Sequence, residues 1–260
     1  FQHGEPTQYH RRLRKTDRIV DFALSLDRIP ITELKDEEEA KRVSSRVIYA
    51  QFPRSSPMYR VLETVALKHM DTVSITFTDE SGFRIRLLQG GADDVHDYDG
   101  PQTFDDFDRW VRRRLTRSED VPEPQAGSAI AVVGQTFEDV VLQPNKDVLL
   151  LVYATWCGFC RKFMPTWEEL ARRVHGTPQL VVAKMDGDLN DSPFPEEFRW
   201  SAFPTVFFVP AGQRSPVVFH GNRSVAHLLD FARKNSKIGL PAELDASKAD
   251  SVVGPDEWEL

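Results

Sequence analysis

The sequence has very little cysteine: two residues, Cys157 and Cys160, in a chain of 260. A fold held together by disulfides would carry more cysteines, spread more widely along the chain. Structural zinc usually needs two such pairs, or one pair with two suitably spaced histidines, and neither pattern follows here. The pair therefore predicts redox chemistry, and we expect no metal and no other cofactor.

The sequence also lacks a long apolar run and an excess of positive charge. No stretch approaches the roughly 18 apolar residues of a membrane-spanning helix, so we expect no membrane insertion. The formal net charge is −7, which gives no reason to expect nucleic-acid binding. A chain of 260 residues with 40% hydrophobic content can form two packed domains.

One stretch, residues 118–128, has the composition of a linker, with two prolines, a glycine and little periodicity. We therefore predict a domain over residues 1–120, a linker over 121–129 and a second domain over 130–240. The remaining residues, 241–260, are acidic and poor in core-forming side chains. We expect this tail to be disordered.

The first domain mixes helical and strand periodicity, which predicts an α/β fold without cysteine or a phosphate loop. Helical spacing occurs at 19–26, 37–44, 61–66 and 104–115. Strand patterns occur at 47–52, 73–77 and 85–87. The basic clusters at 11–15 and 112–114 are expected to be solvated helix faces.

The second domain also reads as α/β. Residues 148–154 form a nearly continuous apolar strand, typical of a sheet covered on both faces. A helix is expected from Cys157 to about Val174, with Pro165 inside it, followed by a strand at 180–185. Residues 205–209 and 217–219 are expected to pair as strands, and Ser224 is expected to cap a final helix.

The strand-to-helix setting of Cys157-Gly158-Phe159-Cys160 suits thiol–disulfide exchange, which needs a thiolate nucleophile and a second, resolving thiol. Cysteines three apart on the first turn of a helix lie on one face. The helix N-terminus favours the thiolate of the first cysteine. Cys157 is thus the predicted nucleophile and Cys160 the resolving thiol. The alternative is two buried thiols without chemistry.

These motifs, with Pro165, Asp186, 203–205 and 221–223, resemble the catalytic thioredoxin-like domain of protein disulfide isomerases over residues 130–235. The resemblance implies a cis peptide bond before Pro204 and a backbone at Phe203 free to bind an extended substrate. Trp156, Gly158 and Phe159 would form an apolar rim for substrate peptides, beside Thr205. Arg223 would be the mobile arginine that stabilises the resolving thiolate. A trans Pro204 and a solvated Arg223 are the simpler alternatives.

Two positions depart from the family pattern. Phe159 replaces the usual histidine between the cysteines, whose charge stabilises the first thiolate. We therefore predict a less oxidising site than in a typical isomerase. Leu151 replaces a buried glutamate that accepts the proton of the second cysteine, which a leucine cannot do. We therefore also predict slow resolution of mixed disulfides.

The family resemblance implies a fold of two thioredoxin-like domains, each a mixed central sheet flanked by helices, with the first domain binding unfolded clients. It also implies work on unfolded or misfolded secretory proteins in the endoplasmic reticulum lumen, with a disulfide oxidase or reductase for recycling. The ending Glu257-Trp-Glu-Leu260 resembles a retrieval signal, which predicts a retrieval receptor as partner. Two alternatives are a thioredoxin-like general reductase and a client-binding chaperone with weak redox chemistry.

Overall fold

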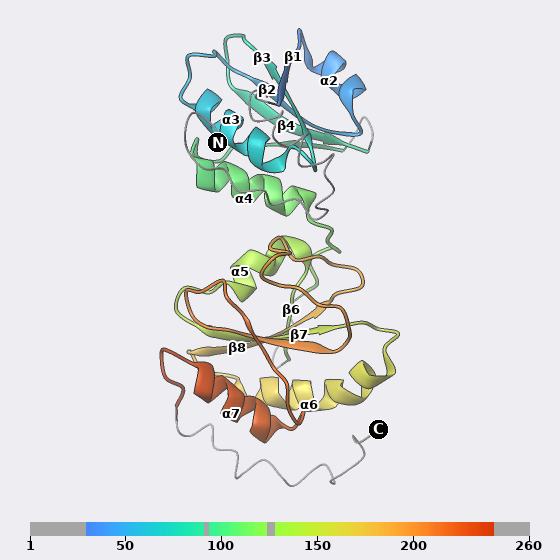
Figure 1. The fold of residues 1–260 in the computed structure, drawn as a ribbon, viewed down its shortest axis with the longest axis vertical. Helices are drawn as coiled ribbons and strands as arrows, with labels where there is room; N and C mark the ends of the chain where they lie inside the picture. The colour runs from blue at the N-terminus through green and yellow to red at the C-terminus, as the bar shows by residue number, and fades with distance from the viewer. Residues whose placement is uncertain (1–29, 91–93, 124–127, 242–260) are drawn as a thin grey trace, which may run out of the picture. The chain divides into compact units, whose positions relative to one another are not determined.

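The computed structural model describes residues 30–90, 94–123 and 128–241 (Figure 1). The chain forms two compact units that divide between Leu115 and Thr116. The predicted helix at 19–26, the proposed retrieval signal and part of the predicted linker lie outside the described residues.

The first unit is a five-stranded mixed sheet with helices packed against it. Its strands lie in the order β1-β3-β2-β4-β5, with β1, β3 and β2 parallel and with β4 antiparallel to both β2 and β5. The elements in chain order are β1 (Ile31–Glu33), α2 (Glu37–Val43), β2 (Arg46–Gln51), α3 (Met58–His69), β3 (Ser74–Thr78), β4 (Arg84–Gln89), β5 (Val95–Asp97) and α4 (Phe104–Leu115).

The second unit repeats this topology strand for strand. Its sheet has the order β6-β8-β7-β9-β10, and the pairs again run parallel, parallel, antiparallel and antiparallel. The elements are β6 (Ile130–Ala131), η1 (Gly134–Thr136), α5 (Phe137–Val141), β7 (Asp147–Tyr153), α6 (Gly158–Val174), β8 (Leu180–Asp186), β9 (Thr205–Val209), β10 (Val217–Val218) and α7 (Val225–Asn235). The prediction of two α/β domains with mixed sheets is confirmed.

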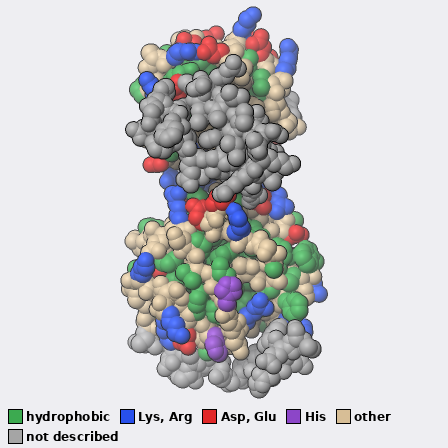
Figure 2. Space-filling model, viewed as in Figure 1, with side chains coloured by type: hydrophobic (Ala, Val, Ile, Leu, Met, Phe, Trp, Pro, Cys, Tyr) green, Lys and Arg blue, Asp and Glu red, His purple; other side chains and the backbone are tan. Residues whose placement is uncertain are grey.

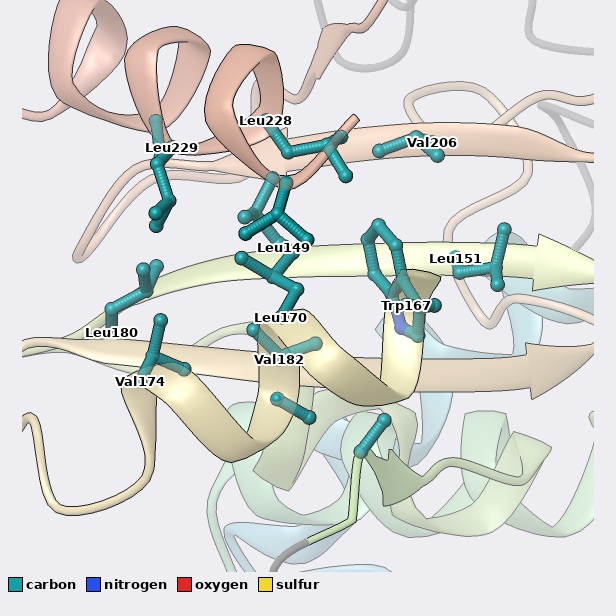
Figure 3. Close-up of a cluster of buried hydrophobic side chains, with 14 of the residues drawn as sticks. Leu149, Leu151, Trp167, Leu170, Val174, Leu180, Val182, Val206, Leu228 and Leu229 are labelled. Carbon is teal, nitrogen blue, oxygen red and sulfur yellow. The ribbon is translucent and has the colours of Figure 1, made fainter. Parts of the chain in front are cut away.

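The central strand β7 explains how the second unit is built around its cysteines. Its alternate side chains enter two separate cores, because successive residues of a strand point to opposite faces. Leu149 and Leu151 join the core under α6 and α7 (Figure 3), whereas Leu150 joins the core on the other face. Trp167 of α6 is fully buried in the first of these cores and donates from its indole to the carbonyl of Ala183, at 3.1 Å. Both faces of β7 are covered, as its apolar sequence predicts.

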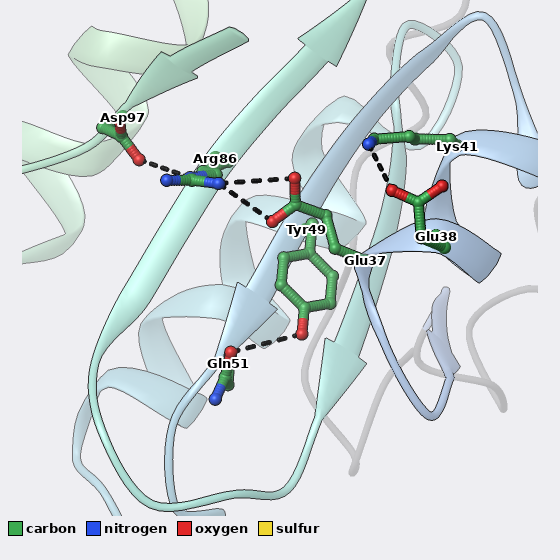
Figure 4. Close-up of polar contacts among 7 residues, drawn as sticks. All are labelled: Glu37, Glu38, Lys41, Tyr49, Gln51, Arg86 and Asp97. Atoms are coloured by element: carbon green, nitrogen blue, oxygen red, sulfur yellow. Dashed lines mark hydrogen bonds and ion pairs between the residues drawn. The ribbon is translucent and has the colours of Figure 1, made fainter. Parts of the chain in front are cut away.

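Ion pairs fasten the outer elements of the first unit to its sheet. The guanidinium of Arg86 on β4 donates to Asp97 of β5 at 2.6 Å and to Glu37 of α2 at 3.1 Å (Figure 4). A second cluster ties α3 to α4. There the buried Asp108 accepts from Lys68 at 2.7 Å and pairs with His69 at 2.8 Å.

The visible surface carries charges of both signs. In the view of Figure 2, basic and acidic side chains are both visible, and neither sign forms one continuous patch. Within the described residues, no helix is both long enough and apolar enough to span a bilayer.

Candidate functional site

Cys157 lies at the N-cap of α6, directly after the loop that follows β7. Its Sγ accepts a hydrogen bond from the backbone N–H of Cys160 at 3.2 Å, which is one of the unpaired donors of the first helical turn. Both cysteines are free thiols. The geometry holds the two sulfur-bearing side chains on the same turn, and a charge on Cys157 would lie at the positive end of the helix.

Cys160 lies deeper than Cys157, with 1% of its surface exposed against 6%. Both pack with Ala154 and against Tyr153 and Phe203. The pKa of the Cys160 thiol is raised to about 11, mainly by burial and then by its hydrogen bond with Cys157. The Cys160 thiol therefore keeps its proton at neutral pH.

The Phe203–Pro204 peptide bond is cis, as predicted. It lies at the start of β9, and the hydroxyl of Thr205 donates back to the carbonyl of Ala202 at 2.7 Å. The Cys157 thiol donates to the carbonyl of Phe203, with an Sγ to oxygen distance of 3.6 Å. The backbone next to Pro204 is thus in direct contact with the first cysteine.

Two large aromatic side chains project beside the cysteines. Trp156 is 62% exposed and Phe159 is 59% exposed. The ring of Trp156 meets that of Phe203 edge to face, with centroids 5.8 Å apart. Gly158, between Cys157 and Phe159, has open space around it, since an added Cβ would come no closer than 4.0 Å to the Arg161 guanidinium. The structure brings all the predicted rim residues to one end of the sheet.

Arg223 lies over the ring of Phe163, with its guanidinium carbon 5.7 Å from the ring centroid. Its positive charge lowers the pKa of Cys160, against the larger effects of burial and of the Cys157 hydrogen bond. Phe163 belongs to the same helix as Cys160. The arginine is therefore half-buried against the helix of the cysteines, close enough for its charge to favour a Cys160 thiolate.

Leu151 is fully buried in the core under α6, beside Trp167 (Figure 3). Its neighbour across the parallel pair is Lys184, whose ammonium binds Glu168 of α6 at 2.5 Å. That carboxylate also accepts from the backbone N–H of Ala129 at 2.9 Å. The Glu168 carboxylate is thus engaged with Lys184 and with the backbone.

Sequence reasoning missed the loop that follows β8. Asp188 in this loop accepts a hydrogen bond from the indole of Trp156 at 3.0 Å, and Asn190 is completely buried. Arg161 was missed as well; it donates to the carbonyl oxygens of Thr155 and Trp156 at 3.3 and 3.2 Å. The polar run from Asp186 to Asn190 after a buried strand was the available signal, but the strand pattern does not reveal its partners.

In the parts of the chain that the structure describes, no group of three or more His, Cys, Asp or Glu side chains is arranged to hold a metal ion. The chemistry available at this end of the sheet is that of the two thiols and their surroundings.

Residues 128–234 match the family described as Thioredoxin. Among curated proteins, the chain is 36% identical over 174 residues to protein disulfide isomerase-like 1-4 of Oryza sativa subsp. japonica, covering 63% of this chain and 30% of that protein. It is 34% identical over 170 residues to protein disulfide-isomerase A4 of Homo sapiens, covering 64% and 25%. It is 34% identical over 249 residues to the A4 protein of Mus musculus, covering 83% and 38%.

The second unit is therefore a thioredoxin domain with a Cys-x-x-Cys pair at the start of its first long helix, and the first unit has the same strand order and strand directions without cysteine. The similarity extends to named isomerases of a plant and of mammals. Residues 128–234 belong to the thioredoxin family, and the chain is similar to proteins named as protein disulfide isomerases. It spans about a third or less of the length of the first two of these relatives.

Proposed function

We propose that the protein is a thiol–disulfide oxidoreductase and isomerase that acts on disulfides of folding client proteins. The observation that carries this proposal is the asymmetry of the two thiols. Cys157 caps α6 and keeps 6% of its surface exposed, whereas Cys160 lies deeper at 1% and has a raised pKa. Such a pair supplies one attacking and one resolving sulfur.

The exchange proceeds in two displacements. The Cys157 thiolate attacks one sulfur of a client disulfide, which forms a mixed disulfide and releases the other client sulfur as a thiolate. Cys160 then loses its proton and attacks Cys157, which closes the Cys157–Cys160 disulfide and releases the second client sulfur. The client gains two electrons and the protein loses two. The reverse sequence oxidises a client, and attack by a second client thiol rearranges its disulfides.

The surroundings of the thiols support this assignment. The exposed rings of Trp156 and Phe159 offer apolar surface for an unfolded segment. The backbone of Phe203 lies against Cys157, where an extended client strand could pair with it. Arg223 would assist Cys160 during release, because its charge stabilises the thiolate.

We place this activity in the endoplasmic reticulum lumen, where disulfides form and persist in folding secretory proteins. The partners in this proposal are unfolded clients, an oxidase or reductase that resets the cysteine pair, and a retrieval receptor. Similarity to proteins named as protein disulfide isomerases supports this placement. Imaging the full chain against a lumenal marker tests it.

The test of function is refolding of a scrambled multi-disulfide protein together with the redox potential of the Cys157–Cys160 couple. The wild-type chain is expected to restore native disulfides catalytically. Cys157→Ser should abolish turnover, and Cys160→Ser should accumulate a mixed disulfide through Cys157. A variant that carries both Cys157→Ser and Cys160→Ser tests the chaperone alternative. That alternative replaces this proposal if the double variant protects clients from aggregation as well as wild type does, and if wild type shows no turnover.

A further inference from the structure

The loop that follows β8, residues 187–191, is built against the rim of the cysteine site. Asp188 accepts the indole hydrogen bond of Trp156 at 3.0 Å. Gly187 donates from its backbone N–H to the carbonyl of Tyr153 at 2.8 Å. A Cβ on Gly187 would come within 2.4 Å of Val152 and 3.0 Å of the Phe203 ring, so the loop backbone is packed tightly there. The position of this loop therefore sets the position of Trp156.

A second segment holds the same loop from its other side. Residues 117–119, which we call the lead-in segment, open the second unit. The Arg117 guanidinium donates to the carbonyl of Asp188 at 2.8 Å and to the carboxylate of Asp191 at 3.1 Å. The backbone N–H of Asp191 donates in return to the carbonyl of Arg117 at 3.0 Å.

Asn190 joins the lead-in segment to the loop within the protein interior. Its side-chain oxygen accepts from the backbone N–H of Glu119 at 2.9 Å and from that of Gly134 at 3.2 Å. Its amide donates to the Glu119 carboxylate at 2.7 Å and to the carbonyl of Asp186 at 3.0 Å. All four hydrogen-bonding positions of this fully buried side chain are used. Such a satisfied buried network specifies one arrangement of the loop.

We propose that Asp188 is a positioning residue for client binding, and that the lead-in segment sets its geometry through Arg117 and Asn190. Asp188 fixes the indole of Trp156 at the rim, so that the exposed ring is held ready for an apolar client segment. Preorganisation of this kind lowers the ordering cost of binding without changing the exchange chemistry. This proposal rests on the proposed function and deepens it.

The experiment compares full-length variants by steady-state kinetics with a short peptide disulfide and by fluorescence anisotropy of Trp156. Asp188→Leu removes the acceptor at an exposed position, and Asp188→Asn keeps an acceptor oxygen while removing the charge. Loss of one hydrogen bond of this kind should raise KM by about threefold to tenfold, with kcat within about twofold. Asp188→Asn should restore wild-type KM. The Trp156 signal is isolated by subtracting the spectrum of Trp156→Phe.

Two further variants complete the design. Arg117→Ala, at a half-exposed side chain, should raise KM in the same direction by a smaller factor. Glu197→Leu makes the same change at an exposed acid outside the loop and should match wild type. The anisotropy of Trp156 should fall in Asp188→Leu and remain high in Asp188→Asn, and this readout does not require turnover.

The outcomes separate the two proposals. Wild-type KM and anisotropy in Asp188→Leu would overturn the positioning role, and so would equal losses in Asp188→Asn and Asp188→Leu. A wild-type chain without turnover would overturn the proposed function, while the anisotropy series would still decide whether Asp188 holds Trp156.

Discussion

Leu151 places an apolar side chain, rather than a carboxylate, at its buried position on β7. Cys160 has a raised pKa, and the neighbouring Glu168 is bound to Lys184. We therefore expect the proton of Cys160 to leave slowly, with the charge of Arg223 favouring the thiolate that results. Each of these features lies on a single side chain, so single substitutions address them.

Leu151→Glu is expected to speed release of mixed disulfides, because a buried carboxylate can accept the Cys160 proton. Burial of this group should lower the free energy of unfolding by about 2 to 4 kcal/mol. Quenched-flow trapping of a peptide mixed disulfide measures the release rate. Leu151→Gln is the matched control, since it has a similar size and cannot take the proton. Equal release rates in the two variants would contradict the role of the carboxylate as acceptor of the Cys160 proton.

Phe159→His is expected to make the couple more oxidising, because a histidine cation beside Cys157 stabilises the reduced, thiolate form. The side chain is 59% exposed, so the fold should be unaffected. One such interaction corresponds to a shift on the order of 30 mV toward a more positive potential. Equilibration with glutathione measures it, with Phe159→Leu as control. An unchanged potential would show that this position does not tune the site.

Because of Cys160, the free energy of unfolding is expected to fall as the pH becomes alkaline. Its pKa rises from an ordinary 9.0 to about 11 in the folded protein, chiefly through burial. Between these values the unfolded chain loses the proton and the folded chain keeps it. The stabilisation present below pH 9 is therefore lost as pH rises through about 11. Urea unfolding at pH 8 and pH 10 should show a larger decrease for wild type than for Cys160→Ala; equal decreases would contradict this.

At the scale of helices and strands, the sequence predicted the long central elements well and the short edge elements poorly. The apolar run of β7 and the periodicity of α6 are strong signals, because the spacing of their apolar residues indicates which faces are buried. The strands β1, β5 and β6 have two or three residues each, too few for an alternating apolar and polar pattern to be recognised. Their places come from pairing with strands far away in the sequence, which no local pattern records.

The site followed the same rule. The capping position of Cys157 and the cis bond before Pro204 follow from a motif and a resemblance that are legible in sequence. The bond between Asp188 and Trp156 joins two loops 32 positions apart, and only the packed structure brings them together.

A single buried carboxylate links helices α3 and α4. Asp108 is 3% exposed and pairs with Lys68, His69 and Arg112. Despite burial, which acts in the opposite direction, these partners hold the pKa of Asp108 well below its usual range. Its contribution to stability is thus present above the ordinary carboxylate pKa and fades as pH falls through the lowered value.

Asp108→Ala should therefore destabilise the first unit by about 3 kcal/mol, since it leaves partly buried cations without their carboxylate. The cysteine chemistry should be unchanged, because that chemistry resides in the other unit. Urea unfolding followed by near-ultraviolet circular dichroism measures the effect, and Asp105→Ala on the same helix is the control. Equal stabilities of these two variants would mean that the cluster contributes nothing to the fold.

At the scale of the whole molecule, one topology occurs twice and is used differently. The loop between β2 and α3, which corresponds to the cysteine loop of the second unit, contains Phe52 and Ser55 but no cysteine. Phe83 lies before β4, in the place that Pro204 has before β9, and it is 40% exposed and stacked on Phe52. The first unit thus retains the framework and presents aromatic surface where its counterpart presents thiols.

Removing the first unit should therefore affect large clients more than small ones. A fragment over residues 116–241 is expected to reduce a short peptide disulfide at a rate within about twofold of the full chain, because the exchange chemistry is local. Refolding of a scrambled protein should slow further, since apolar surface for the client is lost. The measurement is the ratio of the refolding rate to the peptide-reduction rate, for the fragment and for the full-length variant Phe83→Ser. This ratio shows how much the first unit contributes to work on large clients. A proportional loss on both substrates would contradict it.

The contact between the Cys157 thiol and the carbonyl of Phe203 has a consequence for timing. Only the protonated sulfur can donate, so ionisation of Cys157 ends this bond and leaves the carbonyl oxygen facing a negative charge. An amide N–H of an arriving chain could then donate to the Phe203 carbonyl oxygen or to the Cys157 thiolate. Formation of a Cys157 thiolate would therefore free one lone pair of the Phe203 carbonyl, an acceptor that the backbone of an arriving chain could use.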